Sequence, residues 1–352
     1  MDIGGGVESG AFQLQVGSDM QRHTLVTGGA GFIGSYVAAE LCARGYTVTV
    51  LDDLSGGFRE NVPQGARLIE GSITDAALVG DLFARNSFSY VFHLAAYAAE
   101  GLSHFIKRFN YTNNLLGSVN LINASINHGV KCFVFTSSIA VYGTSATLPM
   151  TEETVPHPED PYGIAKLAVE QELRASKQMF DLDYIVFRPH NVFGERQNIA
   201  DRYRNVVGIF MNQVLLNEPM TIFGDGTQTR AFSYIGDVAP IIAESVDCPP
   251  AYNQTFNIGA DRPYTVNALS NAVAKVMDVP PAIAYLPARN EVRDAYSSHE
   301  KVRKVFGERP PTSLEEGLGR MARWVRQFGA KASKPFDSIE VMRNLPPSWQ
   351  RM

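Results

Sequence analysis

The fold is decided by residues 23–52, which read HTLVTGGAGFIGSYVAAELCARGYTVTVLD. A short apolar run at 24–26 predicts a buried strand, and the glycine-rich stretch after it leads into an amphipathic segment that ends near Arg44. A second run of β-branched residues at 46–51 predicts another strand. Strand, tight turn, helix and strand in this order make one βαβ unit, which predicts a parallel sheet.

Three glycines and an aspartate give this unit the chemistry of a dinucleotide site. Gly28 permits the sharp turn, Gly31 lets a pyrophosphate approach bare backbone, and Gly34 lets the helix pack closely on the strand. The phosphate charge then lies at the helix N-terminus. Asp52, 18 residues after Gly34, is placed to accept hydrogen bonds from the adenosine ribose and would repel a 2′-phosphate. The pattern therefore predicts NAD rather than NADP as cofactor.

The composition is that of an ordinary globular protein. The chain has 352 residues, of which 45% are hydrophobic and 19% charged, and a formal net charge of −5. This charge gives no electrostatic reason to expect nucleic acid as a partner, and no basic or long apolar run suggests a membrane. Cys42, Cys132 and Cys248 show no paired spacing. We therefore expect free thiols, no metal, and a cytoplasmic protein.

Strands continue to alternate with helices beyond residue 52. The expected strands are 62–69, 88–95, 130–136 and 184–188, and the expected helices are 76–85, 108–128 and 162–180. This alternation predicts an α/β fold with a Rossmann-type doubly wound parallel sheet, in which ligands bind at the carboxyl ends of the strands.

We expect two lobes with the substrate in the cleft between them. The expected division is a flexible tail at 1–20, an NAD-binding domain at 21–189 with a return segment at about 231–255, a smaller α/β substrate-binding C-terminal lobe at 190–230 and 256–330, and a loosely held tail at 331–352.

Ser138, Tyr162 and Lys166 form the strongest catalytic pattern. Tyr162 and Lys166 are four residues apart on one predicted helix and so share a face. A lysine charge lowers the pKa of the neighbouring phenol from its ordinary value of about 10, so the tyrosine can accept a proton near neutral pH. Ser138 follows the preceding strand and can donate a hydrogen bond to the same substrate oxygen. Tyr-x-x-x-Lys alone is common on solvated helices, and the serine and the glycine turn are what favour catalysis.

Other single residues support a ligand site less specifically. Ser72 offers a hydroxyl where the loop after the third strand passes the adenine, and Ala95 and Ala96 let the backbone run close to a cofactor. A well-packed strand end is the alternative reading of these alanines. Arg230 follows a Gly-Asp-Gly turn and suits bidentate phosphate contact, with an ordinary surface arginine as the alternative.

Six motifs give the chain a family resemblance over about residues 23–320. They are TGGAGFIG (27–34), HLAA (93–96), TSSIAVYG (136–143), PYGIAK (161–166), RPHNVFG (188–194) and FGDGTQTRAFSYIGDVA (223–239). With them the chain resembles the extended short-chain dehydrogenase/reductases, and most closely the NAD-dependent nucleotide-sugar epimerases typified by UDP-glucose 4-epimerase.

The resemblance implies roles for particular residues. It implies catalysis by Ser138, Tyr162 and Lys166. It implies NAD binding by Gly28, Gly31, Phe32, Ile33, Gly34, Asp52, Ser72, Ile73, Leu94, Ala95, Ala96, Tyr162, Lys166 and Pro189. It implies binding of a UDP-sugar by Ser138, Asn191, Phe223, Arg230 and Arg289, with Arg293 as a rival to Arg289 and a core position as the alternative for Phe223. It also implies a homodimer formed by the 108–128 helix and the Tyr162 helix, unless these faces only pack on the sheet.

The reaction that the resemblance implies is reversible epimerisation at C4 of a UDP-hexose through a 4-keto intermediate. Related 4,6-dehydratases place an acidic pair where this chain has Ile139 and Ala140, and decarboxylases place a glutamate at the second position. UDP-glucuronate epimerases place an arginine where this chain has Asn198, although Arg196 and Arg202 lie close in sequence. A neutral hexose is therefore favoured.

Several alternatives stay open. The small Ala295 would leave room for an acetamido group, so the N-acetylated UDP-sugar pair is included. A UDP-glucuronate 4-epimerase, or another nucleotide-sugar epimerase, dehydratase, dehydrogenase or reductase, would use the same three catalytic residues. Outside enzymes, the chain could be an NAD-binding scaffold or sensor, but such a protein has no use for a Tyr–Lys pair beside the nicotinamide.

Overall fold

A seven-stranded parallel sheet forms the centre of the protein. The computed structural model describes residues 22–289, 291–332 and 336–350. The strands are β1 (His23–Thr27), β2 (Thr47–Asp52), β3 (Arg67–Glu70), β4 (Tyr90–His93), β5 (Cys132–Thr136), β6 (Asp183–Pro189) and β11 (Gln254–Ile258). They lie in the order β11-β6-β5-β4-β1-β2-β3, and every neighbouring pair is parallel. The chain order reverses between β1 and β4, which is where such sheets bind dinucleotides.

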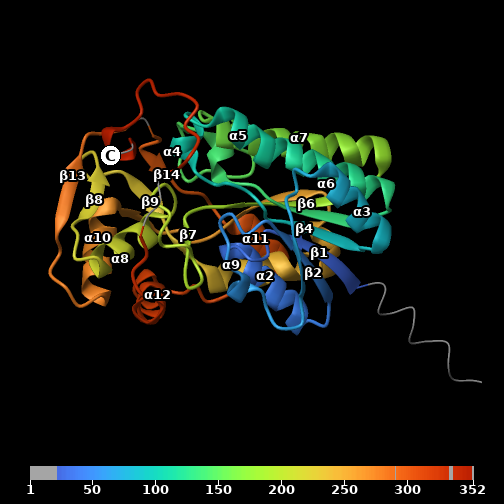
Figure 1. Cartoon of the computed structure of the whole chain (residues 1–352), viewed down its shortest axis with the longest axis horizontal. Helices are drawn as coiled ribbons and strands as arrows, with labels where there is room; N and C mark the ends of the chain where they lie inside the picture. Colours follow the sequence, from blue (N-terminus) through green and yellow to red (C-terminus); the bar gives the residue numbers. More distant parts are fainter. Residues whose placement is uncertain (1–21, 290, 333–335, 351–352) are drawn as a thin grey trace, which may run out of the picture.

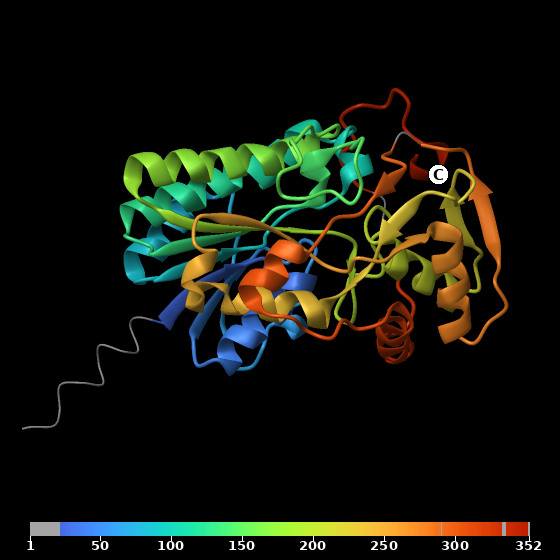
Figure 2. The same cartoon turned by 180° about the vertical axis from the view of Figure 1, so that it is seen from behind.

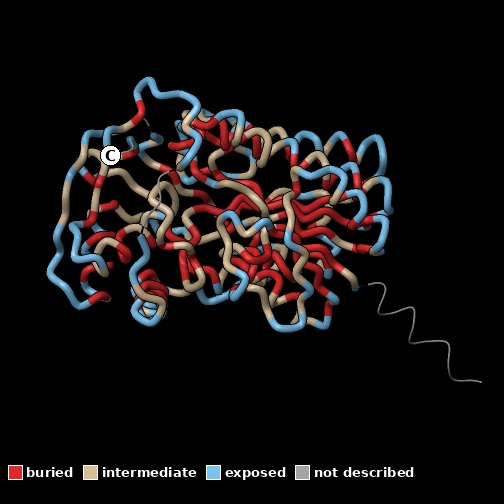
Figure 3. The backbone as a smooth tube through the Cα atoms, in the orientation of Figure 1, coloured by how far each residue is buried: buried red, intermediate tan, exposed pale blue. Residues whose placement is uncertain are grey.

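Helices cover both faces of this sheet (Figures 1 and 2). One layer holds α3 (Ala76–Arg85), α6 (Gly117–Asn127) and α7 (Pro161–Phe180), and the other holds α2 (Phe32–Ala43), α9 (Ile235–Glu244) and α11 (Glu300–Phe306). The inner strands are therefore buried from both sides, as the central red segments in Figure 3 show, whereas the edge strand β3 has no fully buried residue. All five residues of β5, with the sequence CFVFT, are buried. A continuous apolar strand of this kind is typical of a doubly covered parallel sheet.

The helix expected at 108–128 is interrupted by a wider turn. It consists of α5 (Lys107–Tyr111), a five-residue π-helical segment (Thr112–Leu116) and α6. Asn114 lies in the π-helical segment and is 1% exposed. Its side-chain amide exchanges two hydrogen bonds with the backbone of Tyr97, at 2.8 and 3.1 Å. The wider turn thereby fixes the chain that leaves β4, and π-helical turns of this kind often occur at functional sites.

A smaller α/β lobe follows the sheet. Its main elements are α8 (Val206–Leu215), β8 (Met220–Phe223), β9 (Thr229–Ala231), β12 (Pro263–Thr265), α10 (Val266–Val276), β13 (Ile283–Leu286), β14 (Asp294–Ala295) and α12 (Leu314–Phe328). They include a three-stranded sheet, β12-β9-β14, and a two-stranded sheet, β13-β8. The pair of β7 (Val192–Phe193) and β10 (Ser233–Tyr234) lies at the transition between the lobes. The short helices are η2 (Arg59–Asn61), α4 (Glu100–Ser103), η4 (Ile139–Tyr142), η5 (Ser245–Asp247), η6 (Pro249–Ala251) and η7 (Pro347–Trp349).

Two expectations about the second half of the chain are corrected by the structure. The boundary expected at 255–256 runs through β11, which is the edge strand of the central sheet. The short, partly polar sequence QTFNI gave no clear strand pattern. Residues 336–350 are not loosely held, because Leu345 and Trp349 are each only 4% exposed. The N-terminal tail expected at 1–20 lies outside the described residues, as do residues 333–335 and 351–352.

No helix in the described ranges has the length and apolar character needed to cross a bilayer.

Candidate active site

A cavity of about 490 Å³ opens at the carboxyl ends of the central strands, where the two lobes meet. Every residue expected to bind cofactor or substrate, or to act in catalysis, lines this cavity. Its size is within the range typical of small-molecule sites. Arg293 is not among the lining residues; its side chain is 78% exposed and lies beside Asp294. Of the two arginines left open by the sequence, the structure therefore places Arg289 at the cavity.

The glycine turn forms a bare backbone cradle at one end. Gly28 has a φ of +71°, and a Cβ there would lie 2.8 Å from the Cα of Ala95. A Cβ on Gly34 would lie 2.0 Å from the carbonyl oxygen of Gly28, which explains the tight packing of helix on strand. Helix α2 begins at Phe32, and no side chain caps its N-terminus. Its first N–H groups therefore remain available to an anion such as a pyrophosphate.

Asp52 lies beside this cradle at the end of β2. It is 8% exposed, and its two carboxylate oxygens accept hydrogen bonds from the backbone N–H groups of Ala30 and Leu54, each at 2.9 Å. Burial raises the pKa of Asp52, and these hydrogen bonds oppose the rise. A carboxylate has about four acceptor positions, so two remain for ribose hydroxyls. The hydroxyl of Ser72, by contrast, is already engaged with that of Thr74 at 2.9 Å.

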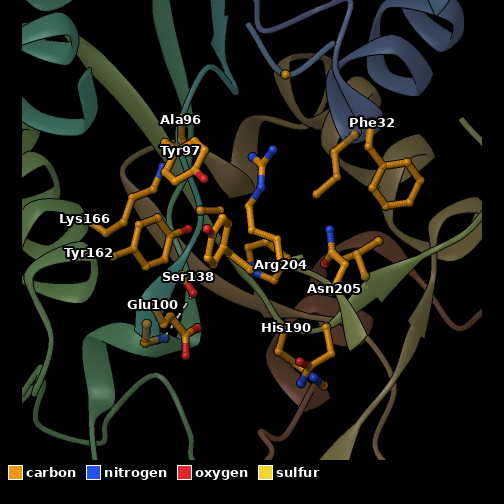
Figure 4. Close-up of a pocket in the computed structure, with 18 of the residues that line it drawn as sticks. Phe32, Ala96, Tyr97, Glu100, Ser138, Tyr162, Lys166, His190, Arg204 and Asn205 are labelled. Carbon is orange, nitrogen blue, oxygen red and sulfur yellow. Dashed lines mark hydrogen bonds between the residues drawn. The ribbon is translucent and has the colours of Figure 1, made fainter. Parts of the chain in front are cut away.

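The three candidate catalytic residues come together on one wall of the cavity (Figure 4). Ser138 follows β5 as the N-cap of η4, whereas Tyr162 and Lys166 lie on the first turns of α7. All three are at least 93% buried. The ammonium of Lys166 donates to the carbonyl oxygen of Thr136 at 2.8 Å and lies 5.7 Å from the centre of the Tyr162 ring.

The charge balance around Tyr162 differs from the sequence expectation. Burial raises the pKa of Tyr162 above its ordinary value, and the carboxyl group of Glu100 raises it further. The Ser138 hydroxyl and the guanidinium of Arg204 act in the opposite direction. Burial also lowers the pKa of Lys166 to about 7. Burial thus opposes the lysine charge on which the expected effect of Lys166 on the phenol depends.

A buried ion pair supports this wall from behind. The guanidinium of Arg188 on β6 donates to both carboxylate oxygens of Glu170 on α7, at 2.9 and 2.5 Å, and both side chains are at most 2% exposed. Glu170 also accepts from the Ser137 hydroxyl at 2.5 Å, and Arg188 donates to the Tyr142 hydroxyl at 2.8 Å. The network joins β6, α7 and the segment of Ser138, so it holds the candidate catalytic residues in fixed relative positions.

Arg230 reaches the cavity from β9 in the second lobe. Its guanidinium donates to the backbone carbonyls of Thr229 (2.8 Å), Arg293 (2.6 Å) and Val292. Three of its five N–H groups are thus used to fix its orientation, and two remain for a ligand. This geometry suits phosphate binding by a pre-oriented guanidinium.

Arg289 lies on the same side of the cavity and packs on an aromatic ring. Its guanidinium lies 4.4 Å from the centre of the Phe223 ring, and it donates to Glu291 through Nε and Nη2. Phe223 is the last residue of β8. Because Arg289 covers one face of Phe223, a nucleobase could stack only on the opposite face.

Among the charged residues of the cavity that were not predicted from the sequence, Glu100 and Arg204 affect the pKa of Tyr162. Glu100 begins the short helix α4, and Figure 4 shows it on the same side of the cavity as Ser138 and Tyr162. Arg204 extends across the cavity; its guanidinium lies 4.6 Å from the centre of the Tyr97 ring and pairs with Asp201 at 2.6 Å. Glu100 could have been identified from the sequence, because it is an acidic residue that follows small, apolar residues just after the HLAA motif. Arg204 offered no such signal.

The cavity wall also fits a polar cofactor. Thr136 Oγ1 belongs to the wall and has no hydrogen-bond partner in the described part of the chain. It lies at the end of β5, next to the lysine and tyrosine, and remains available to a ligand hydroxyl or amide. No group of three or more His, Cys, Asp or Glu side chains among the described residues is arranged to hold a metal ion.

Comparisons with known proteins agree with this architecture. The model of the NAD dependent epimerase/dehydratase family matches residues 24–259. A UDP-glucose 4-epimerase of Mycolicibacterium smegmatis is 34% identical over 310 residues, which are 86% of this chain and 98% of the relative.

Two solved structures are similar over nearly their full lengths. One is a UDP-glucose 4-epimerase of Thermotoga maritima with UDP-glucose, with a TM-score of 0.83, 37% identity, and coverage of 87% of this chain and 99% of that one. The other is a UDP-glucose 4-epimerase of Thermus thermophilus in complex with NAD, with a TM-score of 0.80, 33% identity, and coverage of 86% and 99%.

Proposed function

We propose that this chain, which belongs to the NAD dependent epimerase/dehydratase family, interconverts the C4 epimers of a UDP-hexose through a 4-keto intermediate. NAD is its cofactor; when bound against the glycine cradle and Asp52, it would supply reversible hydride transfer at C4. The observation that carries the proposal is the convergence of Ser138, Tyr162 and Lys166 on a cavity with a glycine cradle at one end and two arginines at the other.

In this proposal Tyr162 removes the proton from the C4 hydroxyl and later returns it, while Ser138 hydrogen-bonds to the C4 oxygen. The raised pKa of Tyr162 means that positive charge must favour the phenolate before it can act as a base. Protonated Lys166, 5.7 Å from the ring centre, and Arg204 are the charges of this chain placed to do so. Lys166 would also hold the nicotinamide ribose.

The nucleotide would be held from the other side of the cavity. Arg230 and Arg289 come from separate segments of the second lobe and both line the cavity, so together they can bind a diphosphate from two directions. Asn191 would contribute an amide contact. A firmly held diphosphate with a loosely held sugar lets the 4-keto sugar rotate about its tether, so that one site can serve both faces.

A neutral sugar fits the cavity best. The carboxyl group of Glu100 faces the same space as Tyr162 and would repel a uronate. Asn198 turns its side-chain oxygen to its own loop, where it accepts from Ala200 N at 3.1 Å, and neither Arg196 nor Arg202 lines the cavity. Arg204 does line it, but its guanidinium is paired with Asp201. Ala295, which does line it, supports the inclusion of N-acetylated hexoses because of its small side chain.

The proposal is tested by incubating purified protein, without added cofactor, with UDP-glucose, UDP-N-acetylglucosamine and UDP-glucuronate separately, and resolving the 4-epimers by chromatography. We expect conversion of a neutral UDP-sugar without net NADH. Net NADH would instead indicate a dehydrogenase, and loss of water a dehydratase. Tyr162→Phe should abolish conversion, whereas Tyr285→Phe, at an exposed position, should not. Near-normal turnover of Tyr162→Phe would refute the mechanism.

We also propose that two copies of the chain associate through the layer of α6 and α7. Leu116, which ends the π-helical segment before α6, and Ile164 on α7 are 57% and 42% exposed and so offer apolar surface to a second copy. A shared four-helix bundle would bury both. Sedimentation of the wild type as a dimer, and of Ile164→Glu as a monomer, would support this assembly; a monomeric wild type would exclude it.

A further inference from the structure

We propose that residues 336–350, here named the C-terminal strap, complete the nucleotide side of the active site, and that Trp349 is the positioning residue for Arg289. The inference rests on the proposed function for what Arg289 binds, a nucleoside diphosphate. It adds to that function a segment near the end of the chain that the sequence had marked as a loose tail. In Figure 1 the strap runs as a red segment from the region of α4 and α5 to the ends of β8 and β13.

One part of the strap is attached to the first lobe. The carboxylate of Glu340 accepts from the backbone N–H groups of Arg108 and Phe109, at 2.7 and 2.9 Å, at the first turn of α5. The backbone N–H of Glu340 in turn donates to the carbonyl of Phe105 at 2.8 Å. A carboxylate on the free N–H groups of a helix start is a favourable arrangement of charge and hydrogen bonds. The strap is thus fixed to the segment that follows α4.

Other parts of the strap are attached to the loop that carries Arg204. Arg202 donates to the carbonyl of Ser348 at 2.8 Å, and the backbone N–H of Phe336 donates to the hydroxyl of Tyr203 at 3.0 Å. The strap therefore bridges the post-β4 segment of the first lobe and the 198–205 loop. Both of these segments contribute residues to the cavity wall.

The strap also has an apolar core of its own. The cluster combines Leu345 and Trp349 with the first-lobe residues Ala99, Leu102 and Ile106, and all five are at most 4% exposed. Burial of a tryptophan and a leucine is a substantial stabilising contribution. The strap is therefore a packed part of the fold.

Trp349 is one of two aromatic residues that contact the guanidinium of Arg289. The guanidinium of Arg289 lies 4.4 Å from the ring centre of Phe223 and 5.5 Å from that of Trp349, and these two rings meet edge to face at 6.4 Å. Gly101 leaves the space that Trp349 fills, because a Cβ there would lie 3.2 Å from the indole. Two aromatic contacts and the ion pair with Glu291 thus limit the rotamers of a long side chain.

The consequence for binding follows from preorganisation. A free arginine loses rotamer entropy when it binds a phosphate, whereas one already held between rings loses less. Removal of Trp349 should therefore weaken the diphosphate contact made by Arg289 and leave the glycine cradle for NAD unchanged.

The test measures nucleoside diphosphate binding to the purified full-length protein by calorimetry, with UDP, dTDP, GDP and ADP as probes. For the tightest of them we expect Trp349→Ala to weaken binding about 3- to 30-fold, as loss of a cation–π contact implies. Trp349→Phe should retain most of the affinity, because a smaller ring remains. Met342→Ala, at a position of the strap that is 63% exposed, is the matched control and should bind normally.

A double-mutant cycle separates positioning from general destabilisation. If Trp349 acts through Arg289, Trp349→Ala should cost little further affinity on an Arg289→Ala background. An equal loss on both backgrounds, or no loss with Trp349→Ala alone, would overturn the inference. Tight binding of a nucleotide other than UDP would refute only the choice of UDP, whereas a wild type that binds none of the four would refute both proposals.

Fluorescence gives an independent reading, because the chain has two tryptophans. Neither of them lines the cavity, but Trp349 contacts Arg289 whereas Trp324 stacks on Phe328 within α12. In Trp324→Phe, which leaves Trp349 as sole tryptophan, the bound nucleotide should change the emission. In Trp349→Phe the emission of Trp324 should stay constant. Unchanged emission from Trp349 on saturation would contradict its coupling to the nucleotide through Arg289.

Discussion

The carboxyl group of Glu100 and the phenol of Tyr162 share one side of the cavity, and the carboxyl raises the pKa of the phenol. The side chain of Glu100 is exposed to the cavity, and the desolvation it experiences within the cavity walls raises its own pKa to about 7. Asp160 acts in the same direction. The charge of Glu100 is therefore gained over the pH range in which the enzyme is expected to work.

Glu100→Gln should move the acid limb of the pH profile of kcat/KM to lower pH, by roughly one unit. Ionised Glu100 disfavours the phenolate, so its removal lowers the pKa of Tyr162 and makes the base available at lower pH. The profile should be measured between pH 5.5 and 9.5 for the best neutral UDP-sugar. Glu153→Gln, on the surface, should leave the profile unchanged. A shift of the acid limb to higher pH would show that Glu100 assists the base.

Lys166→Met should abolish turnover without a loss of fold stability. The pKa of Lys166 is about 7 in the folded protein, against an ordinary value of 10.5, so the unfolded chain binds the extra proton between these pH values. The lysine therefore costs stability at pH 7, and this cost diminishes as the pH rises. The free energy of unfolding of the wild type relative to Lys166→Met should increase by roughly 2 kcal/mol from pH 7 to 9.

Urea denaturation of both proteins at pH 7 and pH 9 measures this difference in the free energy of unfolding. Groups that titrate in the same way in both proteins do not contribute to it. The result is contradicted by a difference that is constant with pH, or by Lys166→Met melting many degrees below the wild type at pH 7.

Glu170→Gln should destabilise the protein by roughly 3–5 kcal/mol, because it leaves the Arg188 guanidinium buried without its counter-charge. Guanidinium chloride denaturation gives the magnitude. Replacement of both partners in Glu170→Leu/Arg188→Met should recover part of the loss, since no uncompensated charge remains. Glu172→Gln, on the same helix, is the control. If the single and the double variant are equally unstable, the network acts by shape and not by charge.

Gly34→Ala should abolish NAD binding, and it should also impair folding, because its Cβ would lie 2.0 Å from the carbonyl oxygen of Gly28. The matched change Gly80→Ala lies in an exposed position of α3 with nothing within 4 Å of the new Cβ, and should stabilise by about 0.5–1 kcal/mol. Bound NAD is quantified by absorbance after release, and stability by thermal melting. Retention of NAD by Gly34→Ala would require a different arrangement of the turn.

The parts of the fold that depend on local pattern could be predicted from sequence. The βαβ unit, the helix at 76–85 and the parallel sheet follow from periodicity and turn chemistry, and the structure confirms them. The π-helical segment at 112–116 could not be predicted, since its cause is the tertiary contact between Asn114 and Tyr97. The edge strand β11 was missed because pairing with β6, and not its own sequence, makes it a strand.

The cavity was predictable to a similar degree. Ser138, Tyr162 and Lys166 lie within 30 residues and carry a recognisable pattern. The pKa shifts of Tyr162 and Lys166 were not predictable, because their main cause is burial, and that of Tyr162 depends further on Glu100 and Arg204, which other loops bring into the cavity. Trp349 contacts Phe223 and Leu102, which lie more than 100 residues earlier in the chain. Contacts between residues this far apart in sequence can be predicted only when the topology is already known.

The C-terminal strap is synthesised after the central sheet, and this order has a consequence for how the protein folds. All seven strands of the central sheet have been synthesised once residue 258 has been added, and the glycine cradle is among the earliest parts. The strap at 336–350 emerges only afterwards. Because domains generally fold from the N-terminal end during synthesis, the sheet and the glycine cradle can form before the strap is available to pack on the first lobe. The strap would then attach to a sheet whose strands are already paired.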